Sequence, residues 1–124
     1  MAIEINIKTE EEIKVVELNG DIDASTAPDI QKEVLPLAEP GSKILVDMTQ
    51  VPYMSSAGLR MFLSLYRKTQ AQKGKAVLVG LSEKLQDTMS MTGFLHFFTT
   101  AEKVDEGKEK LREKVDEGKE KLKE

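Results

Sequence analysis

The chain has 124 residues, of which 40% are hydrophobic, 32% are charged and only 5% are aromatic, so it can form one compact domain with a mainly aliphatic core. Its formal net charge of -4 makes it a poor general binder of nucleic acid or anionic membrane, and we expect neither as a partner. It has no cysteine and a single histidine, His96, which excludes disulfides, thiolate chemistry and multi-histidine metal sites. No metal and no cofactor are expected.

The N-terminal segment does not resemble a targeting signal. Met1 to Ile5 lacks the positive region and the apolar stretch of a signal peptide. No run along the chain approaches the roughly 18 apolar residues needed to cross a bilayer. We therefore expect a cytoplasmic protein.

The strands are predicted from two patterns, alternation of apolar and polar residues and short apolar runs. These patterns occur at residues 3–7, 13–18, 44–46, 76–79 and 94–98. The polar turn at residues 9–12 joins the first two strands as an antiparallel hairpin. The next two runs are wholly apolar, as expected of strands in the centre of a sheet.

Three helices are predicted between and after these strands. The first spans residues 27–37 and follows Thr26, which has capping-box spacing to Asp29. The second begins near Ser56 and carries the i, i+3, i+4, i+7 stripe of Leu59, Phe62, Leu63 and Tyr66. The third is capped by Ser82 and stopped by Gly93.

The order of these elements predicts an α/β domain with a mixed sheet of four to five strands and about four helices, the last one extended. The later strands are expected to run parallel because helices connect them. We expect this domain to span residues 1–105.

A charged helical tail is expected over residues 106–124. Residues 103–113 are repeated almost unchanged at 114–124, and eleven residues make three helical turns, so the apolar positions of both repeats fall on one stripe. These positions are Val104, Leu111, Val115 and Leu122. Two interpretations remain: a helix whose first part docks on the domain, or an extended helix that pairs with a partner chain.

The most informative stretch is residues 51–60, where two serines stand at the start of a predicted helix. Ser55 and Ser56 are followed by the small residues Ala57 and Gly58. A helix start has free backbone N–H groups and partial positive charge, so it accommodates a phosphate, and small neighbours let another protein approach. The alternative is that one of the serines only caps the helix.

Three motifs together resemble those of the STAS domain in anti-sigma-factor antagonists. Residues 54–59 (Met-Ser-Ser-Ala-Gly-Leu) are similar to the family's Asp-Ser-(Ser/Thr)-Gly-Leu signature, with Ser56 at the phosphorylated serine. Residues 20–23 (Gly-Asp-Ile-Asp) match its acidic loop, and residues 26–28 (Thr-Ala-Pro) match the helix opening. The resemblance covers about residues 3–105.

The resemblance implies a bacterial protein–protein switch that regulates transcription. The unphosphorylated antagonist binds an anti-sigma factor and frees the sigma factor. The anti-sigma factor is itself a serine kinase, which phosphorylates Ser56 and so releases the antagonist, and a PP2C-type phosphatase resets the cycle. The implied partner-binding residues are Asp21, Asp23, Met54, Ser55, Ala57, Gly58, Leu59 and Arg60.

Alternatives to these roles remain open at the level of the residues. Asp21 and Asp23 can serve turn formation and helix entry instead, and Arg60 can be a solvated surface residue. Ser55 replaces the family's acidic residue and so becomes an alternative phosphorylation site. The alignment favours Ser56.

No catalytic set is found in the sequence, so the chain is interpreted as a kinase substrate and not as an enzyme. Ser56 lacks a G-x-S-x-G elbow, and no phosphate-binding loop occurs. His96 is expected to be a strand residue. A stand-alone STAS subunit of another signalling or lipid-transport complex, without phospho-switching, remains the alternative function. We expect a monomer or a weak dimer.

Overall fold

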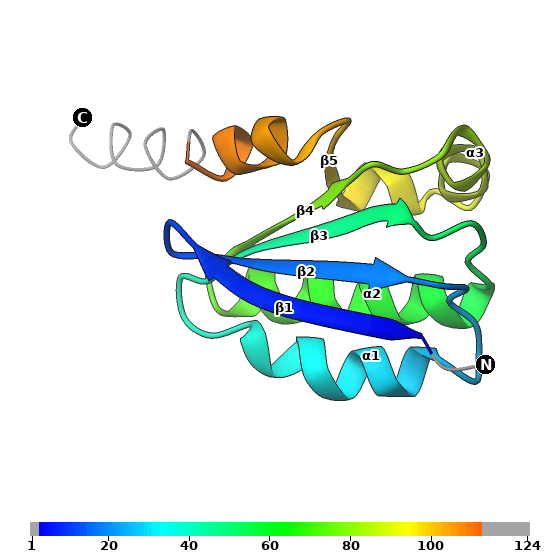
Figure 1. Ribbon diagram of the computed structural model, residues 1–124, viewed down its shortest axis with the longest axis horizontal. Coiled ribbons are helices and arrows are strands. Elements are labelled where there is room, and N and C mark those ends of the chain that lie inside the picture. The colour runs from blue at the N-terminus through cyan, green and yellow to red at the C-terminus, as the bar shows by residue number, and fades with distance from the viewer. Residues whose placement is uncertain (1–2, 113–124) are drawn as a thin grey trace.

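The computed structural model describes residues 3–112 (Figure 1). The sequence of elements alternates as predicted, and the predicted α/β fold with a mixed sheet is confirmed. In chain order the elements are β1 (Glu4–Glu10), β2 (Ile13–Asn19), α1 (Ala27–Val34), η1 (Leu35–Leu37), β3 (Lys43–Gln50), α2 (Ser56–Ala71), β4 (Lys75–Val79), α3 (Glu83–Met91), η2 (Phe94–Phe97) and β5 (Thr99–Ala101). Residues 104–112 form a further helix.

The strands of the described residues lie in one five-stranded sheet in the order β1-β2-β3-β4-β5. β1 and β2 are antiparallel, whereas β2, β3, β4 and β5 run parallel to one another. The hairpin turns at Glu11 and Glu12, both of which have positive φ, as two-residue hairpin loops require. Each parallel connection includes a helix, so the sheet is built by helical crossovers.

The first face of the sheet packs against α1 and α2, which lie side by side beneath it in Figure 1. The core on this face is mainly aliphatic, and its buried aromatic side chains are Phe62, which is fully buried, and Phe98. Alternate residues of the central strands point into it, among them Val16, Val46 and Leu78. The predicted helical stripe is only partly correct, because Leu63 and Tyr66 are half-buried while Leu65 is buried.

The second face of the sheet is covered by the helix of residues 104–112, opposite α1 and α2 (Figure 1). Leu111 of this helix is fully buried against side chains that we call the helix seat. The helix seat consists of Ile13, Val15, Leu45, Val77 and Val79. The central strands are therefore buried on both faces, which explains why they are continuous apolar runs in the sequence.

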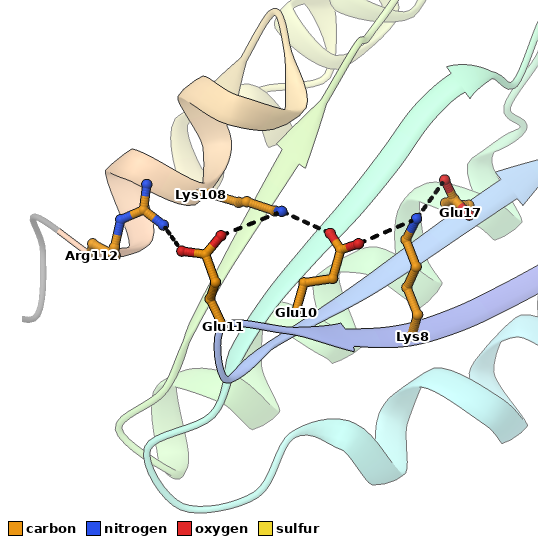
Figure 2. A network of polar contacts seen from close by, with 6 residues as sticks. All are labelled: Lys8, Glu10, Glu11, Glu17, Lys108 and Arg112. Atoms are coloured by element: carbon orange, nitrogen blue, oxygen red, sulfur yellow. Dashed lines mark hydrogen bonds and ion pairs between the residues drawn. The ribbon is translucent and has the colours of Figure 1, made fainter.

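Ion pairs fix this helix to the hairpin (Figure 2). Lys108 Nζ lies 2.7 Å from Glu10 Oε1 and 3.9 Å from Glu11 Oε1, and Arg112 Nη1 lies 2.8 Å from Glu11 Oε2. Glu10 also contacts Lys8, whose Nζ lies 3.6 Å from Glu10 Oε2. The hydrogen bond with Lys108 is the main reason that the pKa of Glu10 lies below its usual value, and the same bond raises the pKa of Lys108.

Two local predictions are wrong. Residues 94–97 form the 3-10 helix η2 instead of a strand, so His96 is not a strand residue, and the last strand begins at Thr99. The aromatic rings of this segment pack on α2, with the Phe97 and Tyr66 ring centroids 5.5 Å apart. Thr26 does not cap α1 through its side chain, because its hydroxyl is bonded within the preceding loop.

Candidate functional site

The candidate site is built where the loop after β2 meets the loop before α2. Ile22 and Met54 form an isolated parallel bridge, in which the Ile22 N–H donates to the Tyr53 carbonyl at 2.9 Å. The Ser55 N–H donates to the Ile22 carbonyl at 2.8 Å. Both bridging side chains are buried. The bridge therefore places the acidic loop, residues 20–23, beside the start of α2.

Gly58 allows this close approach. A β-carbon at position 58 would lie 2.7 Å from Ile22 Cγ2 and 2.7 Å from Met54 Cγ, which is closer than side chains tolerate. Gly58 is buried in the first turn of α2, directly under the bridge. A predicted partner-binding residue thus has a structural role, which is to let the two loops meet.

The two serines differ in exposure and bonding. Ser56 is the first residue of α2 and is exposed. Ser55 is the N-cap residue, but its side chain makes no capping hydrogen bond, and its Oγ is buried without a hydrogen-bond partner among the described residues. The first N–H groups of α2 are therefore not capped by Ser55, and the start of this 16-residue helix keeps its positive character.

Asp23 organises the acidic loop. Its Oδ1 accepts hydrogen bonds from the Ser25 hydroxyl at 2.6 Å, the Ser25 N–H at 2.9 Å and the Thr26 N–H at 3.1 Å. These bonds, led by that from the Ser25 hydroxyl, lower the pKa of Asp23. The buried Thr26 hydroxyl in turn donates to the Asp21 carbonyl at 2.9 Å. Asp23 therefore supports the loop, whereas the Asp21 side chain is exposed.

A shallow hollow of about 240 Å³ lies between α1 and α2 and reaches Ala57, the residue after Ser56. Its lining residues are Ala24, Ala27, Pro28, Gln31, Ala57, Arg60, Met61 and Ser64. Arg60 is exposed, and its guanidinium makes no ion pair within residues 3–112. Leu59 is buried and points into the core, so it cannot touch a partner directly. The hollow offers a partner small apolar side chains and one free positive charge.

The sequence missed the parts of this site that depend on contacts between distant segments. The bridge between Ile22 and Met54 left no local signal apart from an apolar residue between two acids. Ser25 and Thr26, which fix Asp23, resemble any polar helix entry. Gln31 and Ser64, which line the hollow, belong to no recognisable sequence motif.

Residues 3–112 contain neither a candidate metal site nor a helix that could span a membrane. No cluster of three His, Asp or Glu side chains there is placed to hold a metal ion. His96 is exposed in η2. None of the helices in this part of the chain has the length and apolar character needed to cross a membrane.

The chain matches known proteins both in sequence and in fold. The family model described as the STAS domain matches residues 4–107. The chain is 31% identical over 107 residues to the anti-sigma-B factor antagonist of Bacillus subtilis strain 168, an alignment that covers 86% of this chain and 98% of that protein.

Two solved structures share the fold at low sequence identity. An anti-sigma factor antagonist from Mycobacterium paratuberculosis has a TM-score of 0.77 at 22% identity, covering 89% of this chain and 94% of that chain. The phosphorylated form of the Bacillus cell fate determinant SpoIIAA has a TM-score of 0.65 at 17% identity, covering 86% of this chain and 98% of that chain.

Proposed function

Since the chain belongs to the STAS domain family, we propose that it is an anti-sigma factor antagonist controlled by phosphorylation of Ser56. The unphosphorylated chain binds an anti-sigma factor that is also a serine kinase, and thereby frees the sigma factor. Phosphorylation of Ser56 releases the chain, and a PP2C-type phosphatase restores it. The chain is the substrate of this cycle and supplies no catalytic group.

The observation that carries this proposal is the contrast between Ser55 and Ser56. The Ser56 side chain is exposed at the first position of α2, where a kinase active site can reach it. The Ser55 Oγ is buried, so its phosphorylation would require the loop to open. Ser55 was the alternative acceptor by sequence, and its buried hydroxyl favours Ser56.

The physics of the switch follows from the surroundings of Ser56. A phosphate adds about -1.5 to -2 charge at neutral pH, which the uncapped N–H groups at the start of α2 tolerate within the folded chain. A partner seated on the same surface meets a new negative charge in addition to the exposed carboxylate of Asp21. Repulsion and desolvation then weaken the interface while the fold stays intact.

The partner surface that we propose comprises the acidic loop, the start of α2 and the hollow beside it. Asp21 and Arg60 supply exposed charges of opposite sign, and Ala57 supplies a small apolar contact in the hollow. Met54, Gly58 and Asp23 act indirectly, by holding the loops in place. A cytoplasmic location, where ATP and the sigma factor are found, fits this role.

The test is phosphorylation by the cognate anti-sigma kinase with ATP, with the modified residue mapped by mass spectrometry. Ser56→Ala should abolish the signal, and Ser55→Ala should keep it. Loss in Ser55→Ala alone would move the switch to Ser55. Modification of both variants would overturn the assignment to Ser56, because the acceptor would then lie elsewhere or either serine would suffice. If the kinase neither bound nor modified the chain, the chain would instead act as a STAS subunit without phospho-switching.

A further inference from the structure

The helix seat recognises the repeat of residues 103–113 by shape. A β-carbon at Gly107 would lie 2.6 Å from Val79 Cγ2 and 2.9 Å from Leu45 Cδ1, so any larger residue would have to displace these side chains. Glycine otherwise weakens a helix, and its presence here is explained by the contact. Leu111, one turn further on, is 0% exposed in the same cluster.

The repeat is also recognised by charge. Lys108 and Arg112 pair with Glu10 and Glu11 at the hairpin (Figure 2). The Lys110 ammonium donates to the Thr100 carbonyl at 2.6 Å and so ties the helix to β5. The seat therefore selects a helix with a defined combination of apolar, glycine and basic positions.

Residues 114–124 carry this combination again. Each residue of the first repeat that contacts the sheet has a counterpart eleven positions later, and only Arg112 changes, to a lysine that keeps the charge. The counterparts are Val115, Gly118, Lys119, Lys121, Leu122 and Lys123. The spacing of these counterparts along the sequence is the same as in the first repeat. A solvated helix would gain nothing from Gly118, whereas a helix that enters the seat beside Val79 is accommodated best with glycine at this position.

We infer that residues 114–124 are a second ligand of the helix seat, and that the two repeats exchange in the seat of one molecule. The seat accommodates one repeat at a time. Tethering gives the second repeat a high local concentration at its own seat, which favours exchange within the molecule over exchange between molecules. The first repeat predominates because the second needs a connector eleven residues longer, and longer loops cost more entropy to close.

Substitutions in the full chain separate the two repeats. Leu111→Asp should lower the thermal midpoint by a moderate amount, because residues 114–124 replace the first repeat. Leu122→Asp alone should leave the midpoint unchanged. The thermal midpoint of the double variant should fall by more than the sum of the two single changes, since no repeat remains to cover the seat. A double variant no less stable than Leu111→Asp would overturn the inference.

Disulfide trapping tests the exchange independently of stability, since the chain has no cysteine of its own. Val79→Cys with Gly107→Cys is the positive control, and Val79→Cys also removes the methyl group nearest the helix. Val79→Cys with Gly118→Cys should close a disulfide within the monomer under oxidised glutathione. The matched control is Val79→Cys with Glu120→Cys, because Glu109, its counterpart in the first repeat, is exposed.

Closure at position 118 should be faster than at position 120, although slower than at position 107. Equal rates at positions 118 and 120 would overturn the inference, because they would reflect random encounters of the tail. Disulfides found only in dimers would assign the second repeat to the seat of another molecule and would likewise overturn exchange within one chain.

Discussion

Ile22 and Met54 pair as a parallel bridge that holds the acidic loop against the start of α2, and Gly58 lies directly beneath the pair. Gly58→Ala places a methyl group 2.7 Å from side-chain atoms of both residues. We expect the free energy of unfolding to fall by about 1–3 kcal/mol, as in overpacked cores, despite the higher helix propensity of alanine. Urea unfolding measures this change.

A suitable control for this substitution is Gln70→Ala, which lies on the exposed face of α2. The urea midpoint of Gln70→Ala should equal that of the parent chain within experimental error. If Gly58→Ala were equally harmless, the loops would be able to separate at little cost, and the bridge would not fix the site.

Ser55 and Ser82 occupy equivalent N-cap positions but should respond differently to alanine. The Ser82 hydroxyl accepts from the Leu85 N–H at 3.1 Å, so Ser82→Ala should cost about 1 kcal/mol of stability. The Ser55 Oγ is buried without a partner, so Ser55→Ala should be neutral or slightly stabilising. Denaturant midpoints of the two variants give the comparison, and equal losses would contradict it.

Ser56→Asp should reduce binding to the anti-sigma factor while leaving the thermal midpoint nearly unchanged. The side chain is exposed, and a negative charge at the first position of a helix is favourable for the fold. Isothermal titration calorimetry with the kinase and a thermal scan supply the two measurements. A large loss of stability would identify Ser56 as a structural residue. Ser56→Ala, which adds no charge, is the control and should bind normally.

Asp23 should make stability depend on acid pH. Its pKa in the folded chain lies below the ordinary value of 3.8, so its contribution is present above that pH and is lost as the pH falls through the folded value. Asp23→Asn should therefore be less stable than the parent at pH 7, with the difference shrinking towards pH 3. Urea midpoints across this range test the sign. The exposed Asp87→Asn controls for the loss of one charge.

The pairing of Glu10 with Lys108 should stabilise the docked helix over a defined range of pH. The pKa of Glu10 is lowered from 4.5, so its contribution to stability is fully present above pH 4.5 and is lost as the pH falls through the folded value. The pKa of Lys108 is raised from 10.5, so its contribution is fully present below 10.5 and is lost as the pH rises through the folded value.

Glu10→Gln should accordingly lower the thermal midpoint at pH 7 in low salt, and by less in high salt, where the pair is screened. Glu17→Gln is the matched control, because it removes the same charge away from the helix. Glu17 contacts Lys8 at 3.7 Å and accepts from Asn6 Nδ2 at 2.7 Å, a bond that the glutamine side-chain oxygen can keep. A midpoint that fell equally in the two variants would mean that the helix gains nothing from its pairing with the hairpin.

Most of the sheet and its crossovers could be predicted because their signals are local. Apolar and polar residues alternate with period two in the first two strands. Ser82 precedes α3 and Gly93 follows it, as capping rules require. The aromatic residues of segment 94–98 favour a strand, whereas the structure has the 3-10 helix η2 there, with Phe97 packed on Tyr66. Tertiary contacts of this kind have no signature in a single sequence.

The position of the candidate site in the chain could be predicted from its motif, but the contacts that form the site could not. The start of α2 at Ser56 was predicted, whereas the bridge between Ile22 and Met54 joins segments too far apart for pattern analysis. The burial of the Ser55 hydroxyl depends on this bridge, so the choice between two adjacent serines needed the structure. The hydroxyl of Thr26 likewise serves the loop and not α1, although its spacing fits a capping box.

The position of Leu111 has a consequence for the order in which the protein matures on the ribosome. Synthesis runs from the N-terminus, so β2, β3 and β4 are complete before the helix that covers their second face has been made. Until Leu111 emerges from the exit tunnel, the nascent sheet exposes a strip of Val, Ile and Leu side chains to other chains. The docking of the helix that carries Leu111 thus ends the period in which the growing sheet is most prone to aggregation.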